Sequence, residues 1–122
     1  MENPKEKFKR QFEERLINFS ISTIRFCRDI RNNRDCWEIS DQLIRSATSV
    51  GANVVEAKAS SSRKDYIKFF EIALKSANET EYWLILAKNI VGDSPELQKL
   101  FSEVGEIARV LGSSLLTLKG KK

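Results

Sequence analysis

Apolar residues recur along most of the chain at steps of three and four, the spacing that places side chains on one face of an α-helix. Short polar or glycine-containing breaks divide the pattern into four segments, and no alternating β-strand pattern competes with it. The pattern predicts helices over about residues 8–31, 36–59, 62–91 and 95–118. Long helices joined by short connections pack as antiparallel neighbours. We therefore expect an all-α fold, an up-down-up-down antiparallel four-helix bundle, as one domain over residues 1–122.

Residues at the breaks carry helix-boundary signals. Asp35 and Glu38 have the spacing of a capping box at the start of the second helix. Ser62 is the expected N-cap of the third helix, and Gly92 is expected to end it. Ser94, followed by proline, is the expected N-cap of the fourth helix.

The centre of the second predicted helix, SATSVGANVVEA (46–57), is rich in small side chains. Its Gly51 costs about 1 kcal/mol of helix propensity relative to alanine. A close contact with another helix would offset that cost; the alternative is that the glycine is simply tolerated. A polar stripe beside the apolar one is either a solvated edge or a network or interface that fixes helix register. Its members are Gln42, Arg45, Ser49, Asn53 and Glu56, with Glu79 of the third helix as a candidate partner.

The chain carries more apolar helical surface than one four-helix core requires. The surplus positions are Ile17, Ile21, Ile24, Ile44, Val55, Ile67, Phe70, Leu74, Trp83 and Ile85. Contiguous exposed apolar surface usually marks an interface, so we expect a homo-oligomer. The alternative is a wide core-facing arc on each helix.

The composition excludes several kinds of catalytic site. Histidine is absent, which rules out Ser-His-Asp and Cys-His arrangements and histidine-based metal motifs. Cys27 and Cys36 do not form a metal-ligand pattern. No pair of carboxylates stands out, although a carboxylate site remains a distant alternative. We expect a protein that is not an enzyme and needs no cofactor or metal.

The chain has a formal net charge of +4, and the excess is concentrated early: residues 1–36 hold nine Lys/Arg and six Asp/Glu. Basic residues can neutralise phosphates and give salt-sensitive nucleic-acid binding. Solvated charge, or arginine placed favourably at a helix C-terminus, is the competing explanation. The candidate contact set comprises Lys5, Lys7, Lys9 and Arg10, and then Arg25, Arg28, Arg31 and Arg34.

The N-terminal segment is too charged for a secretory signal, and no apolar run approaches the length of a membrane span. We read both cysteines as reduced thiols. The expected compartment is the cytoplasm, with no membrane partner.

Two stretches, QLIRSATSVGANVVEA (42–57) and SSRKDYIKFFEIALKSANETEYWL (61–84), resemble a four-helix-bundle family. That family includes proteins encoded by intervening sequences inserted in bacterial 23S rRNA genes. The residues that carry the resemblance are Gln42, Leu43, Arg45, Ser46, Ser49, Val50, Asn53, Val54 and Glu56, then Ser62, Asp65, Tyr66, Ala73, Ser76, Glu79, Thr80, Tyr82, Trp83 and Leu84. Ala57 departs from the pattern, because many relatives carry glycine there.

The resemblance implies a bundle that assembles as a ring-shaped homopentamer, in which two different faces of the protomer meet. The accessory protein of diversity-generating retroelements is similar to this family and associates with nucleic acid. By that analogy RNA or DNA is the leading partner class. The alternative function is a structural adaptor that binds another protein and has no nucleic-acid role.

Overall fold

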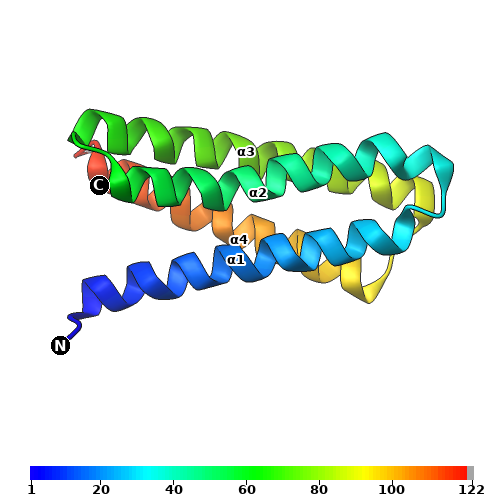
Figure 1. Cartoon of the computed structure of the whole chain (residues 1–122), viewed down its shortest axis with the longest axis horizontal. Helices are drawn as coiled ribbons and strands as arrows, with labels where there is room; N and C mark the ends of the chain where they lie inside the picture. Colours follow the sequence, from blue (N-terminus) through cyan, green and yellow to red (C-terminus); the bar gives the residue numbers. More distant parts are fainter. Residues whose placement is uncertain (121–122) are drawn as a thin grey trace.

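The computed structural model describes residues 1–120 and consists of four helices: α1 (Pro4–Ile30), α2 (Trp37–Ala59), α3 (Arg63–Val91) and α4 (Pro95–Leu118). A short 3₁₀ turn, η1 (Arg34–Cys36), joins α1 to α2. The helices run alternately up and down, so both chain termini lie at the same end of the bundle (Figure 1). The predicted all-α antiparallel four-helix bundle is confirmed. The last two residues of the predicted domain, Lys121 and Lys122, lie outside the described part.

Helix α1 begins at Pro4, four residues before the predicted start near Phe8. The side-chain oxygen of Asn3 accepts a hydrogen bond from the backbone N–H of Glu6, and Pro4 occupies the first turn. Asn is a favoured N-cap, and Pro is tolerated where the helix lacks backbone acceptors. The prediction was wrong because it followed the apolar stripe, whereas polar residues build the first turn.

The start of α2 also differs from the prediction. The side chain of Asn33 caps η1 by accepting from the backbone N–H of Asp35, and α2 then follows Cys36 without a side-chain cap. The predicted Asp35–Glu38 capping box is therefore wrong. The 3₁₀ turn continues directly into the α-helix, so Asp35 lies inside helical structure rather than at its boundary.

The other predicted boundaries are confirmed. Ser62 Oγ accepts from the backbone N–H of Asp65 at the start of α3, and Ser94 Oγ accepts from that of Leu97 at the start of α4. Gly92 ends α3 with φ of 87°, a left-handed conformation that residues with a Cβ rarely adopt.

One continuous core runs along the bundle and is built from all four helices. It includes Leu100 and Ile107 of α4 and Phe70 of α3. Phe70 is only 7% exposed, so its assignment to surplus surface is wrong. A core-facing arc wider than a strict heptad seam explains all three positions.

Part of the predicted surplus does remain in solvent. Ile17 and Ile21 of α1, Val55 of α2 and Ile85 of α3 are each at least 40% exposed. The other predicted positions, Ile24, Ile44, Ile67, Leu74 and Trp83, are half-buried.

The four helices do not stay equally close over their whole length. At the end where the termini lie, the first turns of α1 diverge from the other helices (Figure 1). This open end holds a groove lined by residues of all four helices. At the opposite, closed end, η1 and the α3–α4 connection join the helices, and a second hollow lies on the surface beside Asp93 and Phe101.

Candidate nucleic-acid interface

The predicted contact set splits into two groups at opposite ends of the bundle. Lys5, Lys7, Lys9 and Arg10 lie in the first two turns of α1, while the arginines from Arg25 to Arg34 lie at its other end and in the connection to α2. A rise of about 1.5 Å per residue puts roughly 35 Å between the two groups. They therefore form two separate surfaces on a protomer rather than one.

Nearby carboxylates offset the charge of the arginine group. The stretch 25–41 contains four arginines and four acidic residues (Asp29, Asp35, Glu38 and Asp41). Arg31 forms an ion pair with Asp41, and the guanidinium of Arg34 lies 5.5 Å from the centre of the Trp37 ring. Arg25 and Arg28 are exposed and make no ion pair within residues 1–120. This end is polar and close to neutral.

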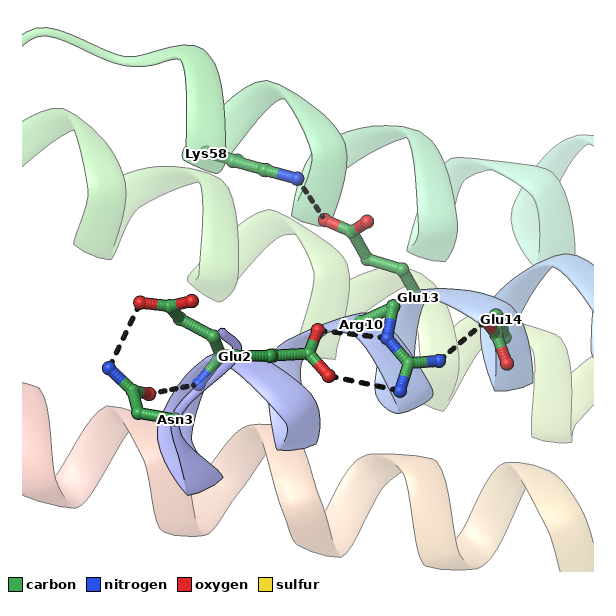
Figure 2. A network of polar contacts seen from close by, with 7 residues as sticks. Glu2, Asn3, Arg10, Glu13, Glu14 and Lys58 are labelled. Atoms are coloured by element: carbon green, nitrogen blue, oxygen red, sulfur yellow. Dashed lines mark hydrogen bonds and ion pairs between the residues drawn. The ribbon is translucent and has the colours of Figure 1, made fainter.

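Most of the lysine group is not neutralised by carboxylates, although its one arginine is ion-paired. The Arg10 guanidinium lies between Glu2 and Glu14 and forms ion pairs with both, at 2.9 and 3.0 Å (Figure 2). The ammonium groups of Lys5, Lys7 and Lys9 are exposed and make no ion pair within the described residues. These three lysines are the free cations of the group.

Two of these lysines, Lys5 and Lys9, border a groove of about 640 Å³ where α1 diverges from the other helices. Four basic residues line it: Lys5 and Lys9 of α1, Lys58 of α2 and Arg63 of α3. A single carboxylate, Glu13, faces them, and its Oε1 lies 3.6 Å from Lys58 Nζ (Figure 2). Arg63 donates to the backbone carbonyl of Leu118. The groove therefore has a net positive charge.

Lys58 and Arg63 were not in the predicted contact set. They flank the serine turn at 60–62, which the sequence marks only as a helix boundary. The packing of the bundle brings this turn beside the first turns of α1, more than 40 residues away in the sequence. The basic residues around this turn could have been identified from the sequence. The sequence does not show, however, that the turn packs beside the first turns of α1.

Aromatic rings form the apolar part of the groove. Phe8 and Phe12 of α1 stack with centroids 6.3 Å apart, and Tyr66 and Phe70 of α3 stack at 4.9 Å. Lys9 Nζ lies 5.9 Å from the centre of the Tyr66 ring, within reach of a cation–π interaction. Burial, and to a lesser extent the nearby Glu13 carboxylate, raises the pKa of the Tyr66 hydroxyl, so this phenol stays neutral at physiological pH.

The polar stripe of α2 is only partly a network. Ser49 Oγ lies 2.9 Å from Ser76 Oγ of α3, and Asn53 Nδ2 donates to Ser49 Oγ and to its carbonyl. Deeper in the core, the Thr80 hydroxyl lies 2.9 Å from Ser46 Oγ, a contact that the predicted set omitted. These hydroxyl contacts link α2 to α3 within one protomer.

The remaining members of the stripe do not join that network. Arg45 and Glu56 are exposed, Gln42 is half-buried, and none of them makes a side-chain hydrogen bond within residues 1–120. Glu79 accepts from Nε1 of Trp83 on its own helix, one turn away, instead of reaching α2. The long side chains thus turn toward solvent and leave the helix contact to short ones.

Gly51 lies opposite α1. A methyl group in place of its hydrogen would be 3.5 Å from Leu16 Cβ, an ordinary van der Waals distance. An alanine therefore fits at this position, whereas a larger side chain would meet Leu16. The helix opposite Gly51 is α1 of the same protomer, and its distance does not require glycine at this position.

In residues 1–120, no group of three or more Cys, Asp or Glu side chains could hold a metal ion. Cys27 and Cys36 are both fully buried and free, and burial raises their thiol pKa values, that of Cys27 to about 11. A protonated, inaccessible thiol is a poor nucleophile. None of the described helices is both long and apolar enough to cross a membrane.

A comparison with protein families decides the relationship. The 23S rRNA-intervening sequence protein family matches residues 10–113 of the chain. The chain belongs to this family. The match spans all four helices, so family membership and the four-helix fold describe the same part of the molecule.

A solved structure of an S23 ribosomal protein family member from Bacteroides thetaiotaomicron is similar to this 23S rRNA-intervening sequence family member. The two chains are 32% identical with a TM-score of 0.79, over 85% of this chain and 97% of the other. The Bacteroides protein has no known function, and the name of the family implies no catalytic activity. A comparison with curated proteins found no match.

The motif residues of the 23S rRNA-intervening sequence resemblance lie in two places: many occupy the α2–α3 contact, and Val54, Ser62 and Tyr66 line the groove. Ser49 and Ser46 of α2 meet Ser76 and Thr80 of α3 through their hydroxyl groups, and Asn53 donates to Ser49 on its own helix. Such contacts fix the register of two helices. Packing therefore explains the hydroxyl contacts of the motif, whereas the four basic residues of the groove are not among the motif residues.

Proposed function

We propose that this family member is a non-catalytic protein that binds RNA or DNA at the end of the bundle where the chain termini lie. The observation that carries the proposal is the groove charge: four basic side chains from three helices face one carboxylate. Lys7 and Lys64 are exposed cations close to these residues in the sequence, although they do not line the groove. A surface of this kind neutralises phosphates and releases their counterions.

The arginine end supports the proposal less well. Its positive and negative charges are equal in number, and two of its four arginines already interact with Asp41 and Trp37. Arg25 and Arg28 are the members that could still meet a phosphate. We keep them as a secondary contact region.

Family names favour RNA among the two nucleic acids. The family is named after 23S rRNA, and the similar structure is assigned to a ribosomal protein family. Those words describe the relatives, so an RNA partner for this chain is part of the proposal.

We also propose that the protein acts as a homo-oligomer, with the pentameric ring implied by the family resemblance as the expected form. Ile17 and Ile21 of α1 and Tyr82 and Ile85 of α3 give exposed apolar surface on two different helices. Two distinct faces are what a closed ring requires. Light scattering checks this part: a stable 14 kDa particle at micromolar concentration would contradict it.

The second candidate function is a structural adaptor for another protein. The same exposed apolar side chains of α3 favour it, because partner proteins bury such surface. In either case we propose the cytoplasm as the compartment, since two thiols packed in the core are typical of a reducing environment.

Salt-titrated fluorescence anisotropy separates the two functions. Labelled RNA and DNA pools are titrated with protein between about 50 and 300 mM salt. We expect dissociation constants that rise steeply with salt, with a logarithmic slope of about 0.7 to 0.9 per neutralised phosphate. No binding to either pool at the lowest salt would favour the adaptor.

A triple variant locates the interface. Replacing Lys5, Lys7 and Lys9 together by glutamine removes three exposed cations and should lower affinity by about tenfold or more and reduce the salt slope. The matched control replaces Lys75, Lys88 and Lys99, which are equally exposed but lie away from the groove. Equal losses in the two variants would mean that net charge, and not this surface, drives binding.

A further inference from the structure

We infer that the groove at the open end of the bundle receives an unpaired base of a single-stranded nucleic acid. This inference rests on the proposed nucleic-acid function and specifies its substrate class. The chemistry required is a planar aromatic ring with a phosphate next to it. Three features of the groove match that chemistry: its aromatic lining, its cations and its hydroxyl groups.

The aromatic lining offers a surface on which a base can stack. Phe8 leaves 55% of its surface in solvent, although Phe12 stacks against it on the same helix. Tyr66 is half-buried on the α3 side of the same groove, backed by Phe70. Exposed rings held by buried rings are rigid platforms, and base stacking on such platforms is the main sequence-tolerant interaction of single-strand binding proteins.

The cations stand where the phosphates flanking that base would lie. Lys5 and Lys9 are within one turn of Phe8 on α1, and Lys9 Nζ already lies near the Tyr66 ring. Lys58 and Arg63 face them from α2 and α3. A base between the rings would therefore have ammonium or guanidinium groups on both sides.

The size and polarity of the groove fit a base with its ribose. A volume of about 640 Å³ falls in the range of sites for small organic groups, about 300–1,000 Å³. Serine and threonine side chains from the 60–62 turn and from the end of α4 make up much of its polar lining. Ser60 and Thr117 donate to backbone carbonyls and Ser62 accepts from a backbone N–H, and a hydroxyl oxygen can accept a further hydrogen bond from a ribose or a base edge.

A duplex cannot use this groove in the same way. Paired bases are stacked on one another inside a helix, so their faces are not available to Phe8 or Tyr66. Only an unpaired base, in a loop, a bulge or an open strand, can enter. We therefore expect single strands to bind more tightly than duplexes of the same length.

The experiment compares three ten-nucleotide probes in anisotropy titrations at fixed salt: oligo(U), its duplex with oligo(A), and an abasic strand that keeps the phosphates. For the wild-type protein we expect oligo(U) to bind about tenfold more tightly than the other two. In Phe8→Ala the affinity for oligo(U) should fall to the level of the abasic strand, with the other two affinities unchanged. Phe8→Trp should keep the preference, because a larger ring still stacks.

The matched control is Ile90→Ala, which removes an exposed apolar side chain of α3 at the opposite end of the bundle, outside the groove and outside the surface proposed for oligomer contacts. It should leave all three affinities unchanged. Circular dichroism and light scattering of each variant should match the wild type. A smaller particle for Phe8→Ala would assign the groove to a neighbouring copy and overturn the inference.

Failure of the inference differs from failure of the proposed function. Equal, salt-sensitive binding of all three probes would overturn the inference and leave the proposed function standing. No binding of any probe would overturn both. UMP or a polyglutamate peptide that binds as tightly as oligo(U), and depends on Phe8 in the same way, would assign the groove to another occupant.

Discussion

The two ends of the bundle are built from the same four helices but differ in packing and in charge. At the end that holds η1, Leu43, Leu84 and Leu97 are fully buried, and Nε1 of Trp37 donates to the carbonyl of Arg31 at 2.7 Å. At the end that holds the termini, Phe12 and Phe70 each keep 7% of their surface exposed and a groove separates their helices. One end is closed and close to neutral, and the other is open and basic.

Packing at the closed end stabilises the fold, whereas the open end leaves side chains exposed that can bind a partner. At the closed end, short connections join α1 to α2 and α3 to α4. Asn33 caps the first connection and Ser94 caps the helix after the second. At the open end α1 has no covalent connection to its neighbours, so only side-chain contacts hold its first turns. A binding surface is more readily built where packing is incomplete.

Leu43→Ala should show the largest effect, a loss of about 3 kcal/mol in the free energy of unfolding, because it leaves a cavity in the closed end. Phe8→Ala at the open end should cost less than about 0.5 kcal/mol, since Phe8 is already exposed. Urea unfolding measures both. Similar losses at the two positions would remove the distinction between the ends.

Alkaline pH should destabilise the closed end through Cys27. Burial raises the pKa of this thiol to about 11, above its value of about 9 in the unfolded chain. The stability that this thiol contributes is fully present below pH 9 and is lost as pH rises to 11, by about 2 kcal/mol. Unfolding curves at pH 8 and pH 10.5 should show a smaller alkaline loss for Cys27→Ala than for the wild type; identical losses would contradict this origin.

Gly51 tests how closely α1 and α2 approach between the two ends. Gly51→Leu should cost about 1–3 kcal/mol, because its branched side chain meets Leu16. Gly51→Ala should instead stabilise by about 0.5–1 kcal/mol through helix propensity, since its methyl group fits. Thermal melts of both variants check the sign. A Gly51→Leu protein with wild-type melting would mean that α1 moves away freely.

A serine N-cap lies at each end of the bundle, so the same cap hydrogen bond can be removed at either end. Ser94→Ala at the closed end and Ser62→Ala at the open end each remove a cap hydrogen bond of 3.1 Å and should cost about 1 kcal/mol. Hydrogen exchange should separate them. Ser62→Ala should accelerate exchange mainly in the first turn of α3, and Ser94→Ala should affect amides along the whole bundle; the reverse pattern would contradict the comparison.

Arg15 should give the smallest effect. Its guanidinium bridges α1 to α4 through Glu103, with Nε 2.7 Å from Oε2, and through Glu106. Arg15→Met should cost about 0.5 kcal/mol at low salt and less at high salt, because all three side chains are partly exposed. Faster exchange in the first turns of α1 would accompany it. A loss that does not change with salt would indicate that the aliphatic stem of Arg15, and not its charge, holds α1.

The sequence was most informative about what depends on local periodicity. The four apolar stripes predicted the helices, and the caps at Ser62 and Ser94 were readable because each bonds a backbone group only three residues away. Two local predictions were wrong. Asn3 starts α1 earlier than the stripe indicates, and Asn33 rather than Asp35 caps the turn before α2.

The candidate site was less readable because its parts come from all four helices. Lys5 and Lys9 were predicted from a local cluster of charge, whereas Lys58 and Arg63 lie beside a serine turn more than 40 residues away. Phe70 was predicted as surplus surface and Tyr66 as a residue of the family motif, and the divergence of α1 turns their end of the core into a groove.

Local sequence thus determined the helix number, the alternation of direction and most of the core, since each depends on spacing within about four residues. The tertiary structure decided which charges face one another. It paired Arg10 with Glu2 and Glu14, balanced the arginines at one end, and gathered cations and rings at the other. Charge recognition depends on distances in space, and those arise only when the helices pack.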